Sequence, residues 1–165
     1  MHPEFSGIID DVLDLRNQFF PRARVVVLSN STTLGNADIF KALMKVDHIM
    51  KLDAGSEEMF RLINRPMVKV RLDEIVANLR RFNGRLTIQT LMLKGEKNGE
   101  VFDNTSGQEL EKYLCRLKMI KPALVMLYPI DRPSPSGDIE KTPPTLIERV
   151  SDRIQKLGIE VKVYP

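Results

Sequence analysis

Polar side chains of types that suit a small polar ligand follow or interrupt four short apolar segments of the chain. They are Asn30, the pair Lys51 and Asp53, Gln89, and the pair Asp131 and Arg132. Ligands of parallel α/β sheets meet the carboxyl ends of the strands, so these side chains are expected to surround one site. Amides, cations and carboxylates together favour a hydroxyl-rich ligand such as a nucleoside.

Each of these residues also has a purely structural interpretation, which the sequence leaves open. Asn30 can shape the turn after its strand and cap the following helix. Lys51 and Asp53 stand two apart on a strand and face the same side, where they can form an ion pair instead of contacting a ligand. Gln89 can be a hydrogen-bonded amide of the core, and the last pair can belong to a solvated loop.

The chain lacks the residues that several other chemistries require. No Gly-rich phosphate loop is present, which argues against a dinucleotide or P-loop site. The single Cys115 excludes an internal disulfide, a cysteine-based zinc site and a self-contained iron–sulfur cluster. His2 and His48 stand far apart and match no metal spacing or nucleophile–base set. The chain itself is therefore predicted to hold no metal and no catalytic residue.

Five segments rich in β-branched and apolar residues predict strands, at residues 24–30, 47–53, 85–93, 123–130 and 159–164. Three of them are near-continuous apolar runs, which predict coverage on both faces of the sheet. Segments with helical spacing separate the strands, in the order α-β-α-β-α-α-β-α-β-α-β. Strands joined by helices predict right-handed crossovers and a mainly parallel sheet.

The helical segments show apolar residues three and four positions apart. These residues are Ile8, Val12 and Leu15; Ile39, Leu43 and Val46; Leu72, Ile75, Val76 and Leu79; Leu110, Leu114 and Leu117; and Leu146, Val150 and Ile154. Ser106 and Glu109 have the spacing of a capping box. Pro143 and Pro144 are placed to open the last helix, and Gly158 to close it.

The overall composition is that of one folded domain spanning residues 1–165. The 165 residues are 42% hydrophobic and 28% charged, which excludes a disordered or fibrous chain. The net charge of +3 is too small to indicate nucleic-acid binding. No apolar run spans a bilayer and the first residues are not a secretory signal, so we expect a cytoplasmic protein that does not enter the membrane.

Read in order, five segments resemble the radical S-adenosylmethionine (radical SAM) enzymes over nearly the whole chain, from His2 to about Pro133. These segments are HPEF, VVVLSNSTTL, MKLDAGSEEMFRLINRP, LTIQTLMLKGEKN and YPIDRP. HPEF is similar to the residues that follow the family's Gly-Glu-Pro motif. INRP is the most specific piece, and it resembles the branch that includes wybutosine-synthesising tRNA enzymes and related activating enzymes.

The departures from the family are as informative as the match. The cluster motif C-x3-C-x2-C and the Gly-Glu-Pro motif itself are absent. The resemblance therefore implies an incomplete parallel (β/α) barrel, a partial TIM barrel that lacks its first strands and retains strands three to six. The chain is expected to be a fragment, inactive when isolated, with the edge strand at residues 24–30 left unpaired. An open edge favours association, so we expect a homodimer or an exchange of elements between chains there.

The resemblance also implies roles for individual residues. Asn30 would contact the methionine or ribose end of S-adenosylmethionine, Lys51 its carboxylate, and Asp53 and Gln89 the ribose. Lys51 stands where the family often has serine. Asp131 and Arg132 would face the substrate or the adenine.

In the full-length enzyme a [4Fe–4S] cluster would cleave S-adenosylmethionine to a 5′-deoxyadenosyl radical, which abstracts hydrogen from an unidentified substrate, tRNA or protein. Neither the cluster nor S-adenosylmethionine is expected to bind stably to the isolated chain. Two alternatives remain open: a cluster-free α/β module that binds a nucleotide or metabolite, and a partner subunit whose sheet edge pairs with another chain.

Overall fold

The computed structural model describes residues 2–97, 99–105, 107–130 and 139–164. Helices and strands alternate along the chain. The elements are α1 (Phe5–Phe19), β1 (Val26–Ser29), α2 (Ala37–Leu43), β2 (Asp47–Lys51), α3 (Glu57–Asn64), α4 (Leu72–Arg80), β3 (Thr87–Met92), β4 (Lys94–Lys97), β5 (Glu100–Asp103), α5 (Gly107–Ile120), β6 (Leu124–Pro129), β7 (Ile139–Glu140), α6 (Pro144–Gln155) and β8 (Glu160–Val163).

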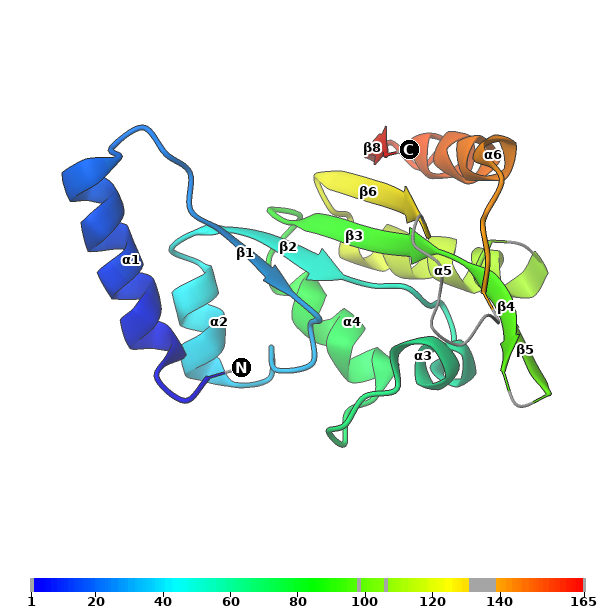
Figure 1. The fold of residues 1–165 in the computed structure, drawn as a ribbon, viewed down its shortest axis with the longest axis horizontal. Coiled ribbons are helices and arrows are strands. Elements are labelled where there is room, and N and C mark those ends of the chain that lie inside the picture. The colour runs from blue at the N-terminus through cyan, green and yellow to red at the C-terminus, as the bar shows by residue number, and fades with distance from the viewer. Residues whose placement is uncertain (1, 98, 106, 131–138, 165) are drawn as a thin grey trace.

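The main sheet has five strands in the order β1-β2-β3-β6-β8, and each neighbouring pair is parallel. These are the five predicted strands, and the α/β fold with a parallel sheet is confirmed. Every return between successive strands passes through at least one helix, which is what parallel pairing requires. Figure 1 shows α1 and α2 beside the edge strand β1, with α6 and β8 at the opposite end.

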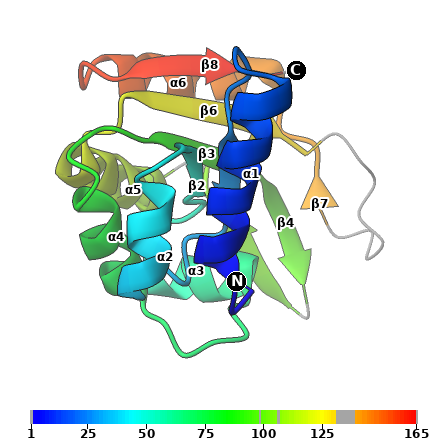
Figure 2. The same ribbon diagram turned by 90° about the vertical axis from the view of Figure 1, so that its left-hand side faces the viewer.

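Only one face of the sheet is fully covered. Ile88, Thr90 and Met92 of β3 are buried, whereas the alternate residues Gln89 and Leu91 are half-buried. Figure 2 shows α2, α4 and α5 on one side of the strands and the small strands β4 and β7 on the other. The prediction of coverage on both faces is therefore wrong for the described residues. The interior of a barrel also carries apolar side chains. An apolar run therefore does not distinguish a strand covered by helices on both faces from a strand with one face toward a barrel interior.

The core lies between the sheet and its helices. The apolar residues predicted for α4 and α5 are all buried, as are Val150 and Ile154 of α6. Pro143 precedes α6 as its N-cap, and Gly158 adopts a φ of +77° after the helix, as predicted. Ser106 lies outside the described residues. The Glu109 carboxylate accepts hydrogen bonds from the N–H groups of Gly55 and Ser56.

Helix α1 forms as predicted, but the apolar face marked by Ile8, Val12 and Leu15 is exposed. Their exposed fractions are 42%, 38% and 55%, whereas Phe5 and Ile9 are buried. In the described part of the chain strand β1 pairs with β2 alone, and its Val26 and Leu28 are also exposed. An apolar helix face beside a free sheet edge is a surface on which another strand could pack. We call the exposed residues of α1 and β1 the open edge.

A second sheet, in the order β5-β4-β7, follows the carboxyl end of β3 and was not predicted. Its strands pair antiparallel and are only two to four residues long. The segment Lys94–Lys97 is mostly charged, so it gives no alternation from which a strand could be read. None of the helices in the described part of the chain has the length and apolarity needed to cross a bilayer.

Gly55, in the loop after β2, lies against the backbone of α5. A Cβ atom at this position would stand 2.1 Å from the Tyr113 nitrogen and 2.8 Å from the Glu109 carbonyl oxygen. Backbone atoms of a helix cannot yield as a side chain can. The contact therefore fixes how closely this loop approaches α5.

We predict that Gly55→Ala lowers the free energy of unfolding by about 2 kcal/mol or more, because the added methyl group forces the loop away from α5. Gly7→Ala is the matched control, since nothing lies within 4 Å of a Cβ at that position in α1. That variant should be stabilised by about 0.5–1 kcal/mol through helix propensity. Urea unfolding measures both, and equal effects would contradict the close approach.

Candidate functional site

A pocket of about 370 Å³ opens at the carboxyl ends of the parallel strands. Its described lining combines two leucine side chains with one cation, two amides and two hydroxyl groups. The described residues that line it are Leu28, Ser29, Asn30, Lys51, Gln89, Leu91 and Tyr128. Three of the four residues predicted to bind a cofactor thus meet in one place.

The strand register explains why these side chains converge. Lys51 of β2 is the register partner of Gln89 of β3, and Leu91 of β3 is the partner of Tyr128 of β6. Partners in a sheet point to the same face, and residues two apart on a strand do so as well. The pocket therefore lies on the open face of the sheet, opposite the buried side chains of β3.

Asn30 forms the turn that leaves β1. Its Oδ1 accepts hydrogen bonds from the Thr32 N–H and Oγ1 at 3.2 and 2.8 Å, while its Nδ2 makes no hydrogen bond to the described part of the chain. Asn36 caps α2 instead, so the alternative that Asn30 caps this helix is wrong. Asn30 therefore combines a turn-forming oxygen with a donor group at the pocket.

The turn after Asn30 is tied to the neighbouring strand. Ser31 is buried with a φ of +68°, and its Oγ donates a hydrogen bond of 2.9 Å to the carbonyl oxygen of Lys51. A left-handed conformation is uncommon for a residue other than glycine and requires support from its surroundings. Here the support comes from the end of β2, so the two strand ends that carry Asn30 and Lys51 are joined.

Lys51 and Asp53 form the ion pair that the sequence left open, with 3.2 Å between Nζ and Oδ2. The Asp53 side chain is fully buried, and it also accepts hydrogen bonds from Asn64 Nδ2 at 2.6 Å and from the Leu91 N–H at 2.9 Å. Lys51 is 36% exposed and reaches the pocket. Asp53 lies behind it and does not line the pocket, a position that does not favour the ribose contact implied by the resemblance.

The charge state of Asp53 follows from its surroundings. Burial raises the pKa of its carboxyl above the ordinary value, while Lys51, the Leu91 N–H and Asn64 act in the opposite direction. A buried carboxylate is costly unless it is paired and hydrogen-bonded. These three donors are therefore what allow a charge at this position.

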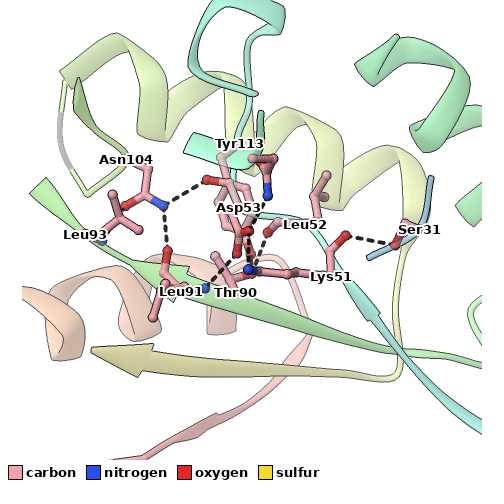
Figure 3. A network of polar contacts seen from close by, with 10 residues as sticks. Ser31, Lys51, Leu52, Asp53, Thr90, Leu91, Leu93, Asn104 and Tyr113 are labelled. Carbon is pink, nitrogen blue, oxygen red and sulfur yellow. Dashed lines mark hydrogen bonds and ion pairs between the residues drawn. The ribbon is translucent and has the colours of Figure 1, made fainter. Parts of the chain in front are cut away.

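Asn104 and Tyr113 complete the buried network around Asp53 (Figure 3). Asn104 Nδ2 donates to the carbonyl oxygens of Asp53 and Leu91 at 2.8 and 2.7 Å, and its Oδ1 accepts from the Leu93 N–H at 2.8 Å. The Tyr113 hydroxyl lies 2.6 Å from that of Thr90, and burial raises the Tyr113 pKa. The Asn104 side chain thus takes the place of the backbone hydrogen bonds that β2 and β3 no longer make to each other where they separate.

Tyr128 of β6 lines the pocket on the side farthest from β1, and Tyr164 packs against it. The rings of Tyr128 and Tyr164 stack at 4.4 Å with 6° between their planes. Burial raises the pKa of Tyr128, Tyr164 adds to the rise, and a hydrogen bond with Gln89 opposes it. Gln89 is thus half-buried at the pocket, not enclosed in the core. Sequence reasoning missed Tyr128, although it stands two positions after Met126 and so shares its face.

The remaining predictions concern residues that take no part in this site. Asp131 and Arg132 lie outside the described residues. No group of three or more histidine, cysteine, aspartate or glutamate side chains within the described ranges could hold a metal ion. Cys115 is exposed on α5, and no acid, histidine or cysteine is among the described residues that line the pocket. The pocket is suited to binding and orienting a ligand, with Lys51 facing an anionic group.

Comparison with known proteins finds one relative by sequence and several by structure, two of which are described below. No protein-family model matches the chain. The UPF0026 protein slr1464 of Synechocystis sp. is 32% identical over 115 residues, which cover 67% of this chain and 40% of that protein. The chain thus spans about two fifths of the length of this curated relative.

Two of the structural relatives show which fold the chain has. A domain of a pyruvate-formate lyase-activating enzyme from Bacteroides vulgatus has a TM-score of 0.67 at 12% identity, and the match covers 100% of this chain and 96% of that domain. A radical SAM methyltransferase from Sphaerobacter thermophilus has a TM-score of 0.60 at 18% identity, covering 84% of this chain and 39% of that enzyme. The chain therefore has the partial TIM-barrel-like fold of these proteins.

We predict opposite pH dependences for two carboxyl groups. The raised pKa of Asp53 means that the folded chain binds this proton more tightly than the unfolded chain. Its contribution to stability therefore falls as the pH rises above the ordinary value of 3.8. The wild type should gain stability relative to Asp53→Asn as the pH is lowered from 7 towards 4.

Asp47 provides the contrast, because the hydrogen bond from Arg24 lowers its pKa. The contribution of Asp47 to stability is present above pH 3.8, the ordinary pKa of the group, and is lost as the pH falls through the lowered pKa of the folded state. Between pH 7 and 4 the difference between the wild type and Asp47→Asn should stay nearly constant. Urea unfolding across this range measures both differences, and parallel curves for the two variants would refute the assignment for Asp53.

Proposed function

We propose that this chain is part of the core of a radical S-adenosylmethionine enzyme, and that its pocket holds S-adenosylmethionine. The observation that carries the proposal is the meeting of Asn30, Lys51 and Gln89 in one pocket at the carboxyl ends of the strands. These are three of the four residues to which the family resemblance assigns contacts with the cofactor. The two structural relatives support the proposal through the fold alone.

The chemistry of the pocket fits this cofactor. S-adenosylmethionine carries a carboxylate, ribose hydroxyls and a flat adenine ring. The Lys51 ammonium suits the carboxylate, and the amides of Asn30 and Gln89 suit hydroxyl groups. Leu91 and the Tyr128 ring offer apolar surface to the adenosyl part. A volume of about 370 Å³ lies within the range of small-ligand sites.

The cluster does not fit this chain. A [4Fe–4S] cluster is held by several cysteine thiolates, and the sequence contains one cysteine. In the proposed enzyme the cluster ligands lie on another part of a longer polypeptide. The role of the present residues is to bind the cofactor's carboxylate and hydroxyl groups, fix its orientation and keep water from it.

The open edge supports the same proposal. A strand that preceded α1 and paired in parallel with β1 would complete a βαβ unit and cover Ile8, Val12 and Leu15. We propose that such strands belong to the longer polypeptide and that the isolated chain is an inactive fragment. The substrate, tRNA or protein, would approach the completed barrel. The alternative function is that of a cluster-free module that binds a nucleotide or metabolite in the same pocket.

In the isolated chain, we propose that a second copy covers the open edge. The open edge joins the exposed apolar residues of α1 to those of β1, which pairs with β2 alone in the described part of the chain. Two antiparallel copies of α1 would join their two exposed apolar faces. The pairing would also give each β1 a partner.

We predict weak binding of S-adenosylhomocysteine to the isolated chain, measured by saturation-transfer NMR. Lys51→Met should weaken it about tenfold or more, because a charge-assisted hydrogen bond to the carboxylate is lost. Lys45→Met is the control, since Lys45 pairs with Asp10 away from the pocket. Equal binding by the two variants would contradict the site. Tight binding of another nucleotide or metabolite would favour the alternative function, a cluster-free binding module.

Light scattering tests the open edge. The isolated chain should be a dimer, and Leu15→Asp should shift it to a monomer because a charge cannot be buried there unpaired. Met67→Asp is the control, because Met67 is fully exposed in the loop between α3 and α4. A wild-type monomer at the highest soluble concentration, or equal effects of the two substitutions, would overturn this proposal.

A further inference from the structure

The INRP segment, the most specific piece of the sequence, has no side chain among the described residues that line the pocket. Asn64 of this segment is the last residue of α3 and donates its 2.6 Å hydrogen bond to Asp53 Oδ2. The same oxygen lies 3.2 Å from Lys51 Nζ. A chain of two contacts therefore links the segment to Lys51, the one cation among the described residues that line the pocket.

We infer that Asn64 and Asp53 are positioning residues that hold the Lys51 ammonium at the pocket wall. The inference deepens the proposed function and rests on it for the identity of the ligand. Neither residue touches the pocket, so both act through Lys51. Figure 3 shows the Lys51 and Asp53 side chains directed toward each other within the buried network.

Both oxygens of the Asp53 carboxylate are occupied, which fixes its orientation. Oδ1 accepts the Leu91 N–H at 2.9 Å, and Oδ2 accepts Asn64 and faces Lys51. Lysine has a flexible stem and a strongly hydrated head, so without a partner its ammonium group would extend into water. A carboxylate anchored to the backbone of β3 gives this group a fixed place beside the strand ends.

Stability alone does not explain an asparagine at position 64. Its Nδ2 is used by Asp53, but its Oδ1 is buried with no hydrogen-bond partner among the described residues. An unsatisfied buried acceptor is unfavourable, and an apolar residue would avoid it. What an apolar residue could not supply is the donor to Asp53.

The position of Asn64 is itself determined by hydrogen bonds at the first turn of α3 and by the backbone conformation at its end. Ser56 caps the first turn through a 3.2 Å hydrogen bond from the Met59 N–H, and Glu57 accepts the Leu72 N–H at 2.7 Å. Arg65 ends the helix with a φ of +41°. The helix therefore stops at Asn64, with its amide beside Asp53.

The test measures Lys51 in the ligand-free protein. Acetic anhydride labelling, quantified by mass spectrometry for each lysine, gives the reactivity of Lys51 relative to that of Lys45. Asn64→Leu should raise the relative rate at Lys51 several-fold, because a carboxylate that has lost the donor fixing its Oδ2 no longer holds the Lys51 ammonium group in place, and the group extends into water where the reagent reaches it. Asp53→Asn should raise it more. Asn78→Leu is the control, since the Asn78 side chain accepts a hydrogen bond from Arg81 on the surface of α4.

A second arm separates this inference from the proposed function. Asn64→Leu should also weaken S-adenosylhomocysteine binding, while Asn78→Leu should not. If labelling of Lys51 rises but no variant or wild type binds the ligand, the positioning role stands and the proposed function fails. If the ligand binds but the Lys51 rate in Asn64→Leu equals that of the wild type, the positioning role is overturned. Asn64→Ser replaces the leucine variant if circular dichroism shows that the latter is unfolded.

Discussion

The carboxylate of Asp53 is the interaction on which the site depends. It is buried where β2 and β3 separate, and a charge in such a place requires donors from several directions. Those donors come from the Lys51 side chain, the β3 backbone at Leu91 and Asn64 at the end of α3. Meeting this one requirement brings together the strand ends and the helix that shape one side of the pocket. Asn104 bridges the same strands from their backbone atoms.

The second constraint is the coverage of the sheet on one face. Helices cover the side that carries Ile88 and Val125, whereas on the opposite side the described strand residues, such as Gln89 and Leu91, are only half-buried. A sheet with an open face can offer its strand ends to a ligand, but it also leaves apolar surface exposed. The pocket and the open edge are thus two results of the same one-sided architecture.

The sequence predicted the strands and most of the helices because their signals are local. Apolar periodicity located the five strands of the sheet and the buried faces of α4 and α5, and the rule for parallel sheets brought Asn30, Lys51 and Gln89 to one pocket. The burial of Asp53 could not be read in this way, because its partners Asn64 and Leu91 stand 11 and 38 residues away. Asn104 acts 51 residues from Asp53. The small sheet was missed for a similar reason, since β4 pairs with β7 across the whole of α5.

The stacked pair of Tyr128 and Tyr164 makes the intrinsic fluorescence of the protein sensitive to the pocket, because Tyr128 lines it. The chain has no tryptophan and three tyrosines, so tyrosine dominates its ultraviolet emission. Tyr113 is buried away from the pocket beside Thr90, whereas Tyr128 lines the pocket and stacks on Tyr164. A ligand that touches Tyr128 alters the surroundings of two of the three fluorophores at once. Occupancy of the pocket can therefore be followed by intrinsic fluorescence without any added label.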